Sequence, residues 1–508
     1  MNKILTVVAV FGSIFTVDAM DGVADIEETC VVTVNNVPYE IADGTARVSK
    51  SFAAGTENLL LRSFIEVNGR TFPVTGTGDQ SFEELFGAAS FLNRFGLRSI
   101  RIPVAVEVIG EKCFKDCNNL YEVTFEEGSR LRKIEAFAFE WSGVKSIRIP
   151  SGTEIIGDGC FRDCRYLKEI IFENDSCLLE IGKGAFEHSK LESICIPAGV
   201  VVINDDSFKY CDLGEVTFAA GSGLKKIGKC VFERSVLGSI CVPAGVEVIG
   251  EESFSCCDLA RITFVMGCNL QTIKRCAFKG SSVKSIRIPA ATEIIEKNCF
   301  RDCKNLREVI IESGSQLKKI RKRVFMSSGL ESIRIPAGVE IFGECSFKEC
   351  CSLREVIFEA GSKLRKIGGE AFSDSGLESI CIPVGTEVFY RYCFRNCANL
   401  RELIFEDDSR LVRIREGAFA NSGINKIRIP GGVQFIGYGC FSDCRNLSEV
   451  IIAENSRLRE IEGDAFSNSG VTSVCVPWAT EIIKCSGDKL KVERFPRRQP
   501  LTEDEAGE

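Results

Sequence analysis

The chain has 508 residues, of which 45% are hydrophobic and 26% are charged, and its formal net charge is −8 at pH 7. This apolar content is enough to build a large core. The negative net charge argues against nucleic acid as a partner, because binding to phosphates requires a basic surface. The acidic excess is spread over the whole chain, and its simplest role is to keep the protein soluble.

The first nineteen residues have the features of a secretory signal peptide. Lys3 supplies a positive charge, and residues 4–17 are apolar but too few to cross a membrane comfortably. The small residues that end at Ala19 predict cleavage after it, and we therefore expect a secreted or surface-associated protein. A retained N-terminal anchor is the alternative. No other segment reaches membrane-spanning length, so no integral span is expected after cleavage.

Residues 20–96 alternate apolar and polar residues without a long period, and Asn68-Gly69 is typical of a hairpin turn. We interpret this segment as an N-terminal cap with degenerate repeats, because the open end of a stacked array exposes its core and a sheet edge. At the other end of the chain, residues 486–508 form a polar tail.

Between these ends, an Ile-Pro or Val-Pro step recurs every 46 or 47 residues. Each period also holds two phenylalanines 22–25 residues apart, so it contains two similar units. A fixed period of this size indicates an architecture of stacked repeats, with about sixteen units over residues 97–485. The prolines are Pro103, Pro150, Pro197, Pro243, Pro289, Pro336, Pro383, Pro430 and Pro477.

The units share the pattern L-x-x-I-x-I-P…V-x-x-I-G-x-x-[CA]-F-x-x-[CS]. Its first part predicts a short strand, and we expect strands to centre near Ile100, Val123, Ile147 and Ile170 and to continue at each half-period. Side chains alternate along a strand, so Ile100 points to the core and Arg101 points to solvent. The proline ends the strand because it has no N–H to donate.

This pattern resembles the leucine-rich repeats of the BspA-like surface-antigen family over roughly residues 97–477. The Ile-Pro step, the I-G-x-x-A-F segment and the junction Cys117-Asn-Asn-Leu120 carry the resemblance. It implies an α/β-type leucine-rich repeat solenoid of mostly strands and loops, right-handed, with a parallel sheet on one face. It also implies a secreted or cell-surface protein that binds other macromolecules.

The 26 cysteines lie mostly in columns that follow the repeat. In leucine-rich repeats the junction position is typically Asn or Cys, so the resemblance implies buried thiols that satisfy loop carbonyls. Disulfides between equivalent positions are disfavoured, because two rungs separate them by about 10 Å and a disulfide needs Cα atoms within about 7 Å. A disulfide inside one C-F-x-x-C loop stays open. The junction column is Cys117, Cys164, Cys211, Cys257, Cys303, Cys350, Cys397 and Cys444.

The sequence offers no catalytic or metal-binding constellation. His188 is the only histidine, so a Ser–His or Cys–His pair could use no other residue. Cysteine pairs with three residues between them (C-x3-C) exist, but nothing completes a set of four zinc ligands. We therefore expect no enzyme activity, no metal and no cofactor.

The outward positions of the strands predict a surface of mixed charge. Arg or Cys occupies the middle of the I-x-I step, while the alternate strand carries Thr or Ile there and mostly Glu two residues earlier. In one interpretation, the arginines and glutamates pair with each other and contribute little. In the other, this face binds a protein through an apolar strip rimmed by charge. The candidate residues are Arg287, Ile310, Arg334, Ile357, Ile404, Arg428 and Ile451.

From these observations we expect an exported repeat protein that contacts another protein, as in adhesion or host contact. The partner would be a host protein, a matrix protein or a second copy of the chain. The alternative is a self-associating spacer in a surface layer or matrix.

Overall fold

The computed structural model describes residues 97–453, 456–482 and 490–495, together with eight strands between residues 6 and 81. The chain divides into two compact units, Met1–Gly245 and Val246–Glu508. The predicted signal segment lies outside the described residues except for β1, and the predicted tail lies outside them except for residues 490–495. The early strands are β1 (Thr6–Val8), β2 (Cys30–Val34), β3 (Val37–Ala42), β4 (Thr45–Val48), β5 (Asn58–Leu60), β6 (Phe64–Val67), β7 (Arg70–Thr77) and β8 (Gln80–Ser81).

The early strands pair mostly as antiparallel hairpins, with parallel pairs between β1 and β2 and between β4 and β7. Strands β2, β3 and β4 pair in antiparallel order, and β6 pairs with β7. Val67 lies opposite Arg70 in this antiparallel pair, and the predicted turn residues Asn68-Gly69 between them lie outside the described residues. Strand β5 pairs in parallel with the strand that begins at Ser99, and a strand of this segment thus extends the sheet of the repeats.

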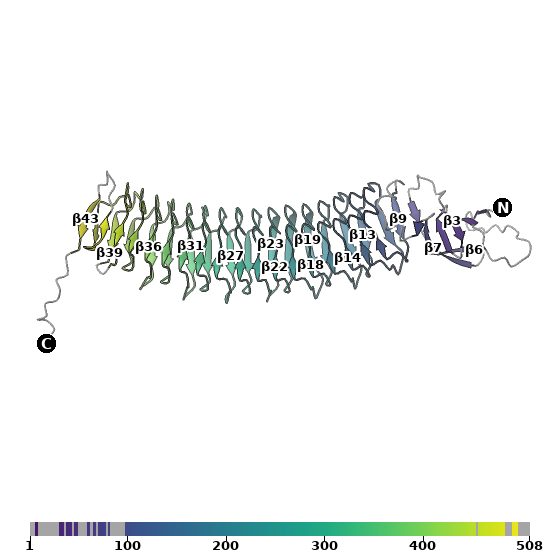
Figure 1. Ribbon diagram of the computed structural model, residues 1–508, viewed down its shortest axis with the longest axis horizontal. Coiled ribbons are helices and arrows are strands. Elements are labelled where there is room, and N and C mark those ends of the chain that lie inside the picture. The colour runs from purple at the N-terminus through teal and green to yellow at the C-terminus, as the bar shows by residue number, and fades with distance from the viewer. Residues whose placement is uncertain are drawn as a thin grey trace, which may run out of the picture. The chain divides into compact units, whose positions relative to one another are not determined.

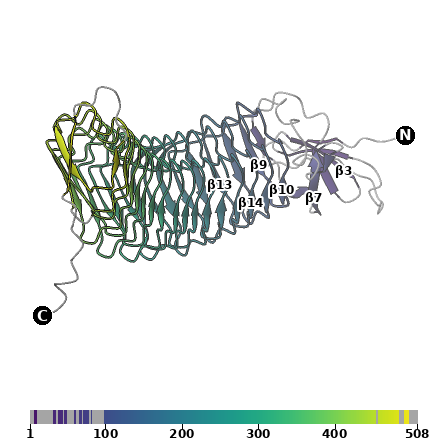
Figure 2. The ribbon, with the colours of Figure 1, turned by 60° about the vertical axis from the view of Figure 1, so that its left-hand side comes forward.

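Each repeat of the first unit forms one rung, with a longer strand on one side of the coil and a two-residue strand on the other (Figure 1). Neighbouring rungs pair in parallel. Figure 2 shows this arrangement at β13 and β14. The longer strands are β9 (Ser99–Ile102), β11 (Glu122–Phe125), β13 (Ser146–Ile149), β15 (Glu169–Phe172), β17 (Ser193–Ile196), β19 (Asp212–Phe218) and β21 (Val236–Val242). The short strands are β10 (Val108–Ile109), β12 (Lys133–Ile134), β14 (Ile155–Ile156), β16 (Glu180–Ile181), β18 (Val202–Ile203) and β20 (Lys226–Ile227).

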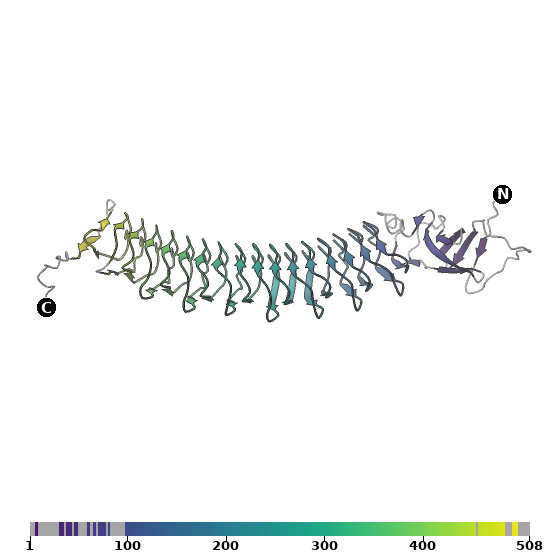
Figure 3. The same ribbon diagram turned by 60° about the horizontal axis from the view of Figure 1, so that its bottom comes forward.

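The second unit repeats the same rung, and its rungs lie side by side (Figure 3). Its longer strands are β23 (Asp258–Phe264), β25 (Ser285–Ile288), β27 (Glu308–Ile311), β29 (Ser332–Ile335), β31 (Glu355–Phe358), β33 (Ser379–Ile382), β35 (Glu402–Phe405), β37 (Lys426–Ile429), β39 (Glu449–Ile452), β41 (Ser473–Val476) and β43 (Lys491–Arg494). Its short strands are β22 (Val248–Ile249), β24 (Thr272–Ile273), β26 (Ile294–Ile295), β28 (Lys319–Ile320), β30 (Ile341–Phe342), β32 (Lys366–Ile367), β34 (Val388–Phe389), β36 (Arg413–Ile414), β38 (Phe435–Ile436), β40 (Glu460–Ile461) and β42 (Glu481–Ile482).

This architecture confirms the predicted solenoid of parallel strands. Strands lie at Ile100, Val123, Ile147 and Ile170, where the half-period places them. The described residues contain no helix, so the fold is a β-solenoid, and the α/β designation of leucine-rich repeats does not describe its connections. Strand β43, which lies within the predicted polar tail, pairs with β41.

Alternation along the strand decides which side chains form the core. In β9 the side chains of Ile100 and Ile102 are buried while Arg101 is exposed. The same pattern recurs at β25, where Ile286 and Ile288 are buried around the exposed Arg287. Because every rung repeats this assignment, each column of the sequence has one fixed environment.

A column of stacked phenylalanine rings runs through the core of each unit, and we call it the phenylalanine spine. Neighbouring ring centroids are 4.9–5.6 Å apart in the first unit and 5.1–5.5 Å apart in the second, with the rings near parallel. Such pairs contribute about 0.5–1.5 kcal/mol beyond their area burial. The spine is Phe114, Phe139, Phe161, Phe186, Phe208 and Phe232 in the first unit, and Phe254, Phe278, Phe300, Phe325, Phe347, Phe372, Phe394, Phe419, Phe441 and Phe466 in the second.

The junction cysteines form a hydrogen-bonded column with serines of the alternate rungs. The thiol of Cys303 donates to the carbonyl oxygen of Phe278 at 2.9 Å and lies 3.6 Å from the hydroxyl of Ser281. The same pair of contacts occurs at Cys350 and Cys397. These contacts confirm that the column thiols satisfy carbonyls of the preceding rung. All 24 cysteines among the described residues are free thiols.

Truncating a ring in the middle of the spine should weaken neighbouring rungs together. Phe300 is fully buried between Phe278 and Phe325. Phe300→Ala should lower the free energy of unfolding by about 3–5 kcal/mol, because it removes a large side chain and leaves a cavity. Hydrogen exchange should show faster opening across residues 270–350, since stability in a repeat array is shared between neighbours.

A matched control for this change is Phe435→Ala on β38, where the ring points outward and is half-buried. Its effect should stay near or below about 1 kcal/mol, because no closed cavity forms. Unchanged exchange at residues 270–350 in Phe300→Ala would contradict the role of the spine.

The cysteine columns predict a distinct pattern of thiol labelling. An alkylating agent at pH 7 should modify exposed thiols such as Cys195, Cys241 and Cys381 in the folded protein. Burial raises the pKa of the Cys303 thiol to about 12, so the junction column should stay unlabelled until the protein unfolds. In denaturant without reductant, most of the 26 cysteines should be labelled, as counted by mass spectrometry. Labelling of only a few would indicate extensive disulfides instead.

Candidate functional site

The outer side of the longer strands in the second unit brings the predicted arginines and isoleucines into one column. The parallel register places Arg287 opposite Ile310 and Arg334 opposite Ile357. Arg428 lies opposite Ile451, and Cys381 takes the place of an arginine opposite Ile404. We call this column the Arg–Ile face.

The residues of the Arg–Ile face are accessible to a partner. Arg287, Arg334 and Arg428 are exposed. Ile404 is 45% exposed and Ile310 is 36% exposed, which is unusual for isoleucine, and Ile357 is half-buried. Single exposed apolar residues need no explanation, but a column that repeats every second rung forms an extended strip.

The backbone does not join all seven predicted residues into one continuous sheet. Strands β25, β27, β29 and β31 form one hydrogen-bonded sheet, which holds Arg287, Ile310, Arg334 and Ile357. Ile404 lies in the pair β33–β35, and Arg428 with Ile451 lies in the pair β37–β39. The four-stranded sheet is therefore the most regular part of the face.

The arginines of this face are not neutralised by the glutamates that lie two residues before each isoleucine. Those glutamates lie opposite Ser285, Ser332 and other small or basic residues, not opposite the arginines. Within the described residues, Arg287 is the one arginine of the candidate set with an ion pair, at 3.9 Å from Glu312. The interpretation of a self-paired Arg–Glu ladder therefore does not describe this column.

Charge pairing runs along a different column, one residue before the longer strands. Arg307 lies 3.7 Å from Glu331, and Arg354 lies 2.9 Å from Glu378. Sequence reasoning missed this column, although Arg and Glu alternate there at intervals of 23 or 24 residues. Charges therefore pair within the protein in the column before the longer strands. In the Arg–Ile face, arginines alternate with isoleucines instead.

A further set of glutamates serves the backbone rather than a ligand. The N–H of Ala290 donates to Glu312 Oε2 at 3.1 Å, and Ala337 and Val384 donate in the same way to glutamates one rung later. Each of these N–H groups follows a proline that ends a strand. The carboxylate thus caps a turn that the sheet leaves unpaired.

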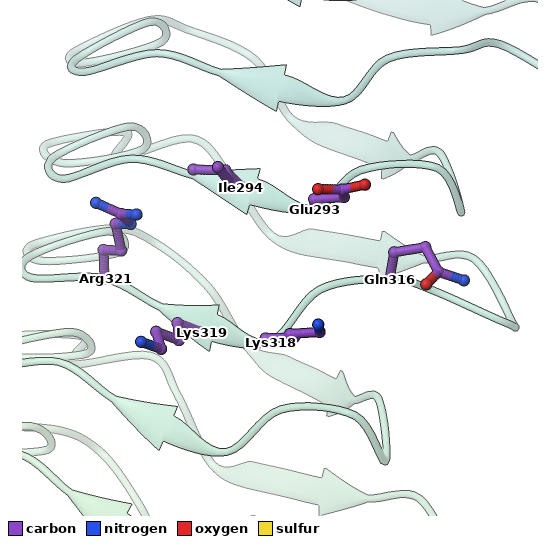
Figure 4. Close-up of a pocket in the computed structure, with 6 residues that line it drawn as sticks. All are labelled: Glu293, Ile294, Gln316, Lys318, Lys319 and Arg321. Carbon is purple, nitrogen blue, oxygen red and sulfur yellow. The ribbon is translucent and has the colours of Figure 1, made fainter.

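On the other side of the coil, the short strands carry a second column in which basic and apolar residues alternate. Around β26 and β28 they line a hollow of about 250 Å³ (Figure 4). Lys318, Lys319 and Arg321 come from one rung, and Glu293 and Ile294 come from the preceding one. Its carboxylate and its three cations make this hollow mixed in charge.

In the described residues, the single histidine and the buried thiols do not form a pair of nucleophile and base. His188 stacks on Tyr210 with ring centroids 4.4 Å apart, and in the described part of the chain no serine or cysteine side chain bonds to its ring. Burial raises the pKa of the Cys303 and Cys350 thiols to about 12, so they are weak nucleophiles at neutral pH. Within the described residues of either unit taken alone, no three potential ligand atoms gather closely enough to hold a metal ion.

Comparison with solved structures gives several matches of low sequence identity. A leucine-rich repeat protein from Bacteroides ovatus is 19% identical, covers 91% of this chain and 99% of its own, and has a TM-score of 0.39. A leucine-rich cell surface protein from Faecalibacterium prausnitzii is 22% identical, covers 83% and 94%, and has a TM-score of 0.34. Among curated proteins, no sequence matches this chain.

The family is established by the sequence itself. The model of the BspA type leucine-rich repeat region matches six times, and its copies overlap from residue 84 to residue 486. They cover residues 84–214, 179–307, 225–354, 271–401, 318–444 and 365–486. Leucine-rich repeat proteins generally bind other proteins. The described residues include no helix long and apolar enough to cross a membrane. The chain belongs to the BspA-type leucine-rich repeat family.

Proposed function

We propose that the protein binds a protein partner through the Arg–Ile face and acts in adhesion or host contact outside the cell. The observation that carries this proposal is the column in which exposed arginines alternate with exposed or half-exposed isoleucines. An apolar centre with charge around it is the anatomy of a protein interface. The signal-like first nineteen residues favour export, and the family supplies the general role of protein binding.

Binding would draw on two physical contributions. Isoleucines such as Ile310 and Ile404 would lose apolar exposed area, which stabilises a complex at about 25 cal/mol per Å² before the costs of association. The arginines would steer an acidic partner and fix its register along the rungs. A partner that contacts several rungs at once gains from multivalency, because the Arg–Ile pair recurs along the face, with Cys381 in place of one arginine.

Reversing the charge of three arginines should test the face. The variant Arg287→Glu, Arg334→Glu and Arg428→Glu should weaken binding to intact cells or to immobilised fibronectin, laminin and collagen, and should change its dependence on salt. The thermal midpoint should stay close to that of the natural chain, because exposed charges contribute little to stability. Surface plasmon resonance and calorimetry measure the two effects.

The control variant reverses Lys319, Lys366 and Arg413, which also recur every second rung but lie on the short strands. Equal loss of binding from both triple variants would contradict a face-specific site. Size-exclusion chromatography separates the alternative: if the natural chain self-associates and the first variant does not, the face joins copies of this chain in a surface layer or matrix.

A further inference from the structure

The turns that follow the phenylalanine spine in the second unit carry a column of amide and carboxylate side chains. We call Asp374, Asn396, Asn421, Asp443 and Asn468 the Asn–Asp ladder; each lies two residues after a spine phenylalanine, in successive rungs. All five have a positive φ between 53° and 59°, a conformation that Asn and Asp adopt more readily than most residues. The backbone alone does not demand them, since Trp141 and His188 occupy the same turn position elsewhere.

Hydrogen bonds join most neighbours of the ladder. Asn396 Nδ2 donates to Asp374 Oδ1 at 2.8 Å, and Asn421 Nδ2 donates to Asn396 Oδ1 at 3.1 Å. Asn468 Nδ2 donates to Asp443 Oδ1 at 3.4 Å. In the described part of the chain, no hydrogen bond joins Asn421 to Asp443.

This break follows from the chemistry of the side chains. An amide presents its NH₂ to one side and its oxygen to the other, while a carboxylate only accepts. Between Asp374 and Asp443 there are three contacts but only two amides, so one contact must set acceptor against acceptor. Exchanging the amide oxygen and nitrogen moves the break to another contact but cannot remove it.

The break lies beside a surface hollow of about 450 Å³ with two aromatic walls. Tyr438 is 51% exposed, and its hydroxyl donates to Asp464 Oδ2 at 3.0 Å. The Tyr392 hydroxyl donates to Glu416 Oε1 at 2.6 Å, and its ring lies so close to Gly417 that no side chain would fit there. Both rings are therefore held in place before any ligand arrives, which lowers the entropic cost of binding.

We propose that this hollow binds a hydroxyl-rich oligosaccharide. Sugar hydroxyls supply the donor that Asn421 and Asp443 lack, and the C–H face of a pyranose ring packs on the exposed ring of Tyr438. Tyr392 and Tyr438 stand two rungs apart, about 10 Å by strand spacing. The Arg395 guanidinium lies over the Tyr392 ring at 5.3 Å from its centroid, so a ligand longer than one sugar would stack on Tyr438 and extend to the polar groups around Tyr392. This site is separate from the Arg–Ile face, because it lies on the turns and not on the longer strands.

The other residues of the hollow favour a sugar over a metal ion or an apolar peptide. Ca²⁺ takes six to eight oxygen ligands, whereas Arg395 and Arg445 place two cations at the same hollow. Ala420 is the one aliphatic side chain among the residues that line it. Side chains of both charges suit hydroxyl groups, which donate and accept.

The sharpest test is Asp443→Asn, which supplies the missing donor. The added amide can donate to Asn421 and still accept from Asn468, so the ladder closes and no longer needs a hydroxyl donor. On an array of defined mannose-, galactose- and N-acetylglucosamine-containing oligosaccharides, the full natural chain should bind at least one member. Asp443→Asn should lower that affinity about tenfold, and its thermal midpoint should rise.

A second variant, Tyr438→Ala, should also lower the affinity about tenfold, because it removes the exposed aromatic surface. The matched controls are Asp163→Asn, at the same turn position in the first unit, and Tyr166→Ala, whose ring is 59% exposed outside the hollow. Both controls should bind as the natural chain does. Absence of binding to every oligosaccharide, or equal binding by Asp443→Asn, would overturn the proposal. A thermal shift caused by CaCl₂ alone, and lost in Asp443→Asn, would overturn it in favour of a cation site.

Discussion

The stacking of one phenylalanine per rung is the interaction on which the other features depend. A ring pressed between two identical rings cannot move along the axis or tilt without losing contact on both sides, and centroids near 5 Å match the separation of paired strands. The spine therefore fixes the rise of each rung, and with it the register in which every outer column is displayed. The thiols and hydroxyls of the junction column reinforce this rise, because Cys303 and Ser281 bond across the same step.

A fixed rise makes differences between columns informative. Every residue of a column has the same backbone environment, so within one column the side chains alone decide whether neighbouring residues pair. In the column before the longer strands, Arg354 and Glu378 form an ion pair, so their charges are satisfied within the protein. In the Arg–Ile face, Arg334 faces Ile357, and neither side chain satisfies the other.

In the Asn–Asp ladder, the number of hydrogen-bond donors relative to the number of contacts creates the proposed site. Each amide in the stack donates to one neighbour and accepts from the other. A carboxylate at each end of the stack can only accept. The number of contacts then exceeds the number of donors by one, and the position of the deficit is set by the identities at Asn421 and Asp443. Backbone strain does not enter, since the positive φ is shared by every member of the column.

The sequence by itself determined the repeat, the positions of the strands and the inward or outward direction of each column, because period and alternation are properties of the chain. It also identified the Phe column and the buried junction cysteines, since residues that recur at equal intervals must lie in equal environments. The pairing of charges could be seen only in the tertiary structure. Arg307 contacts Glu331 because the parallel register places the two residues next to each other on neighbouring rungs. The three-dimensional arrangement also showed that the four-stranded sheet of the Arg–Ile face ends after β31. It showed as well that Tyr392 and Tyr438 line the same hollow. Those outcomes depend on small differences in how neighbouring rungs pack, and the sequence period, which is the same in every rung, does not encode them.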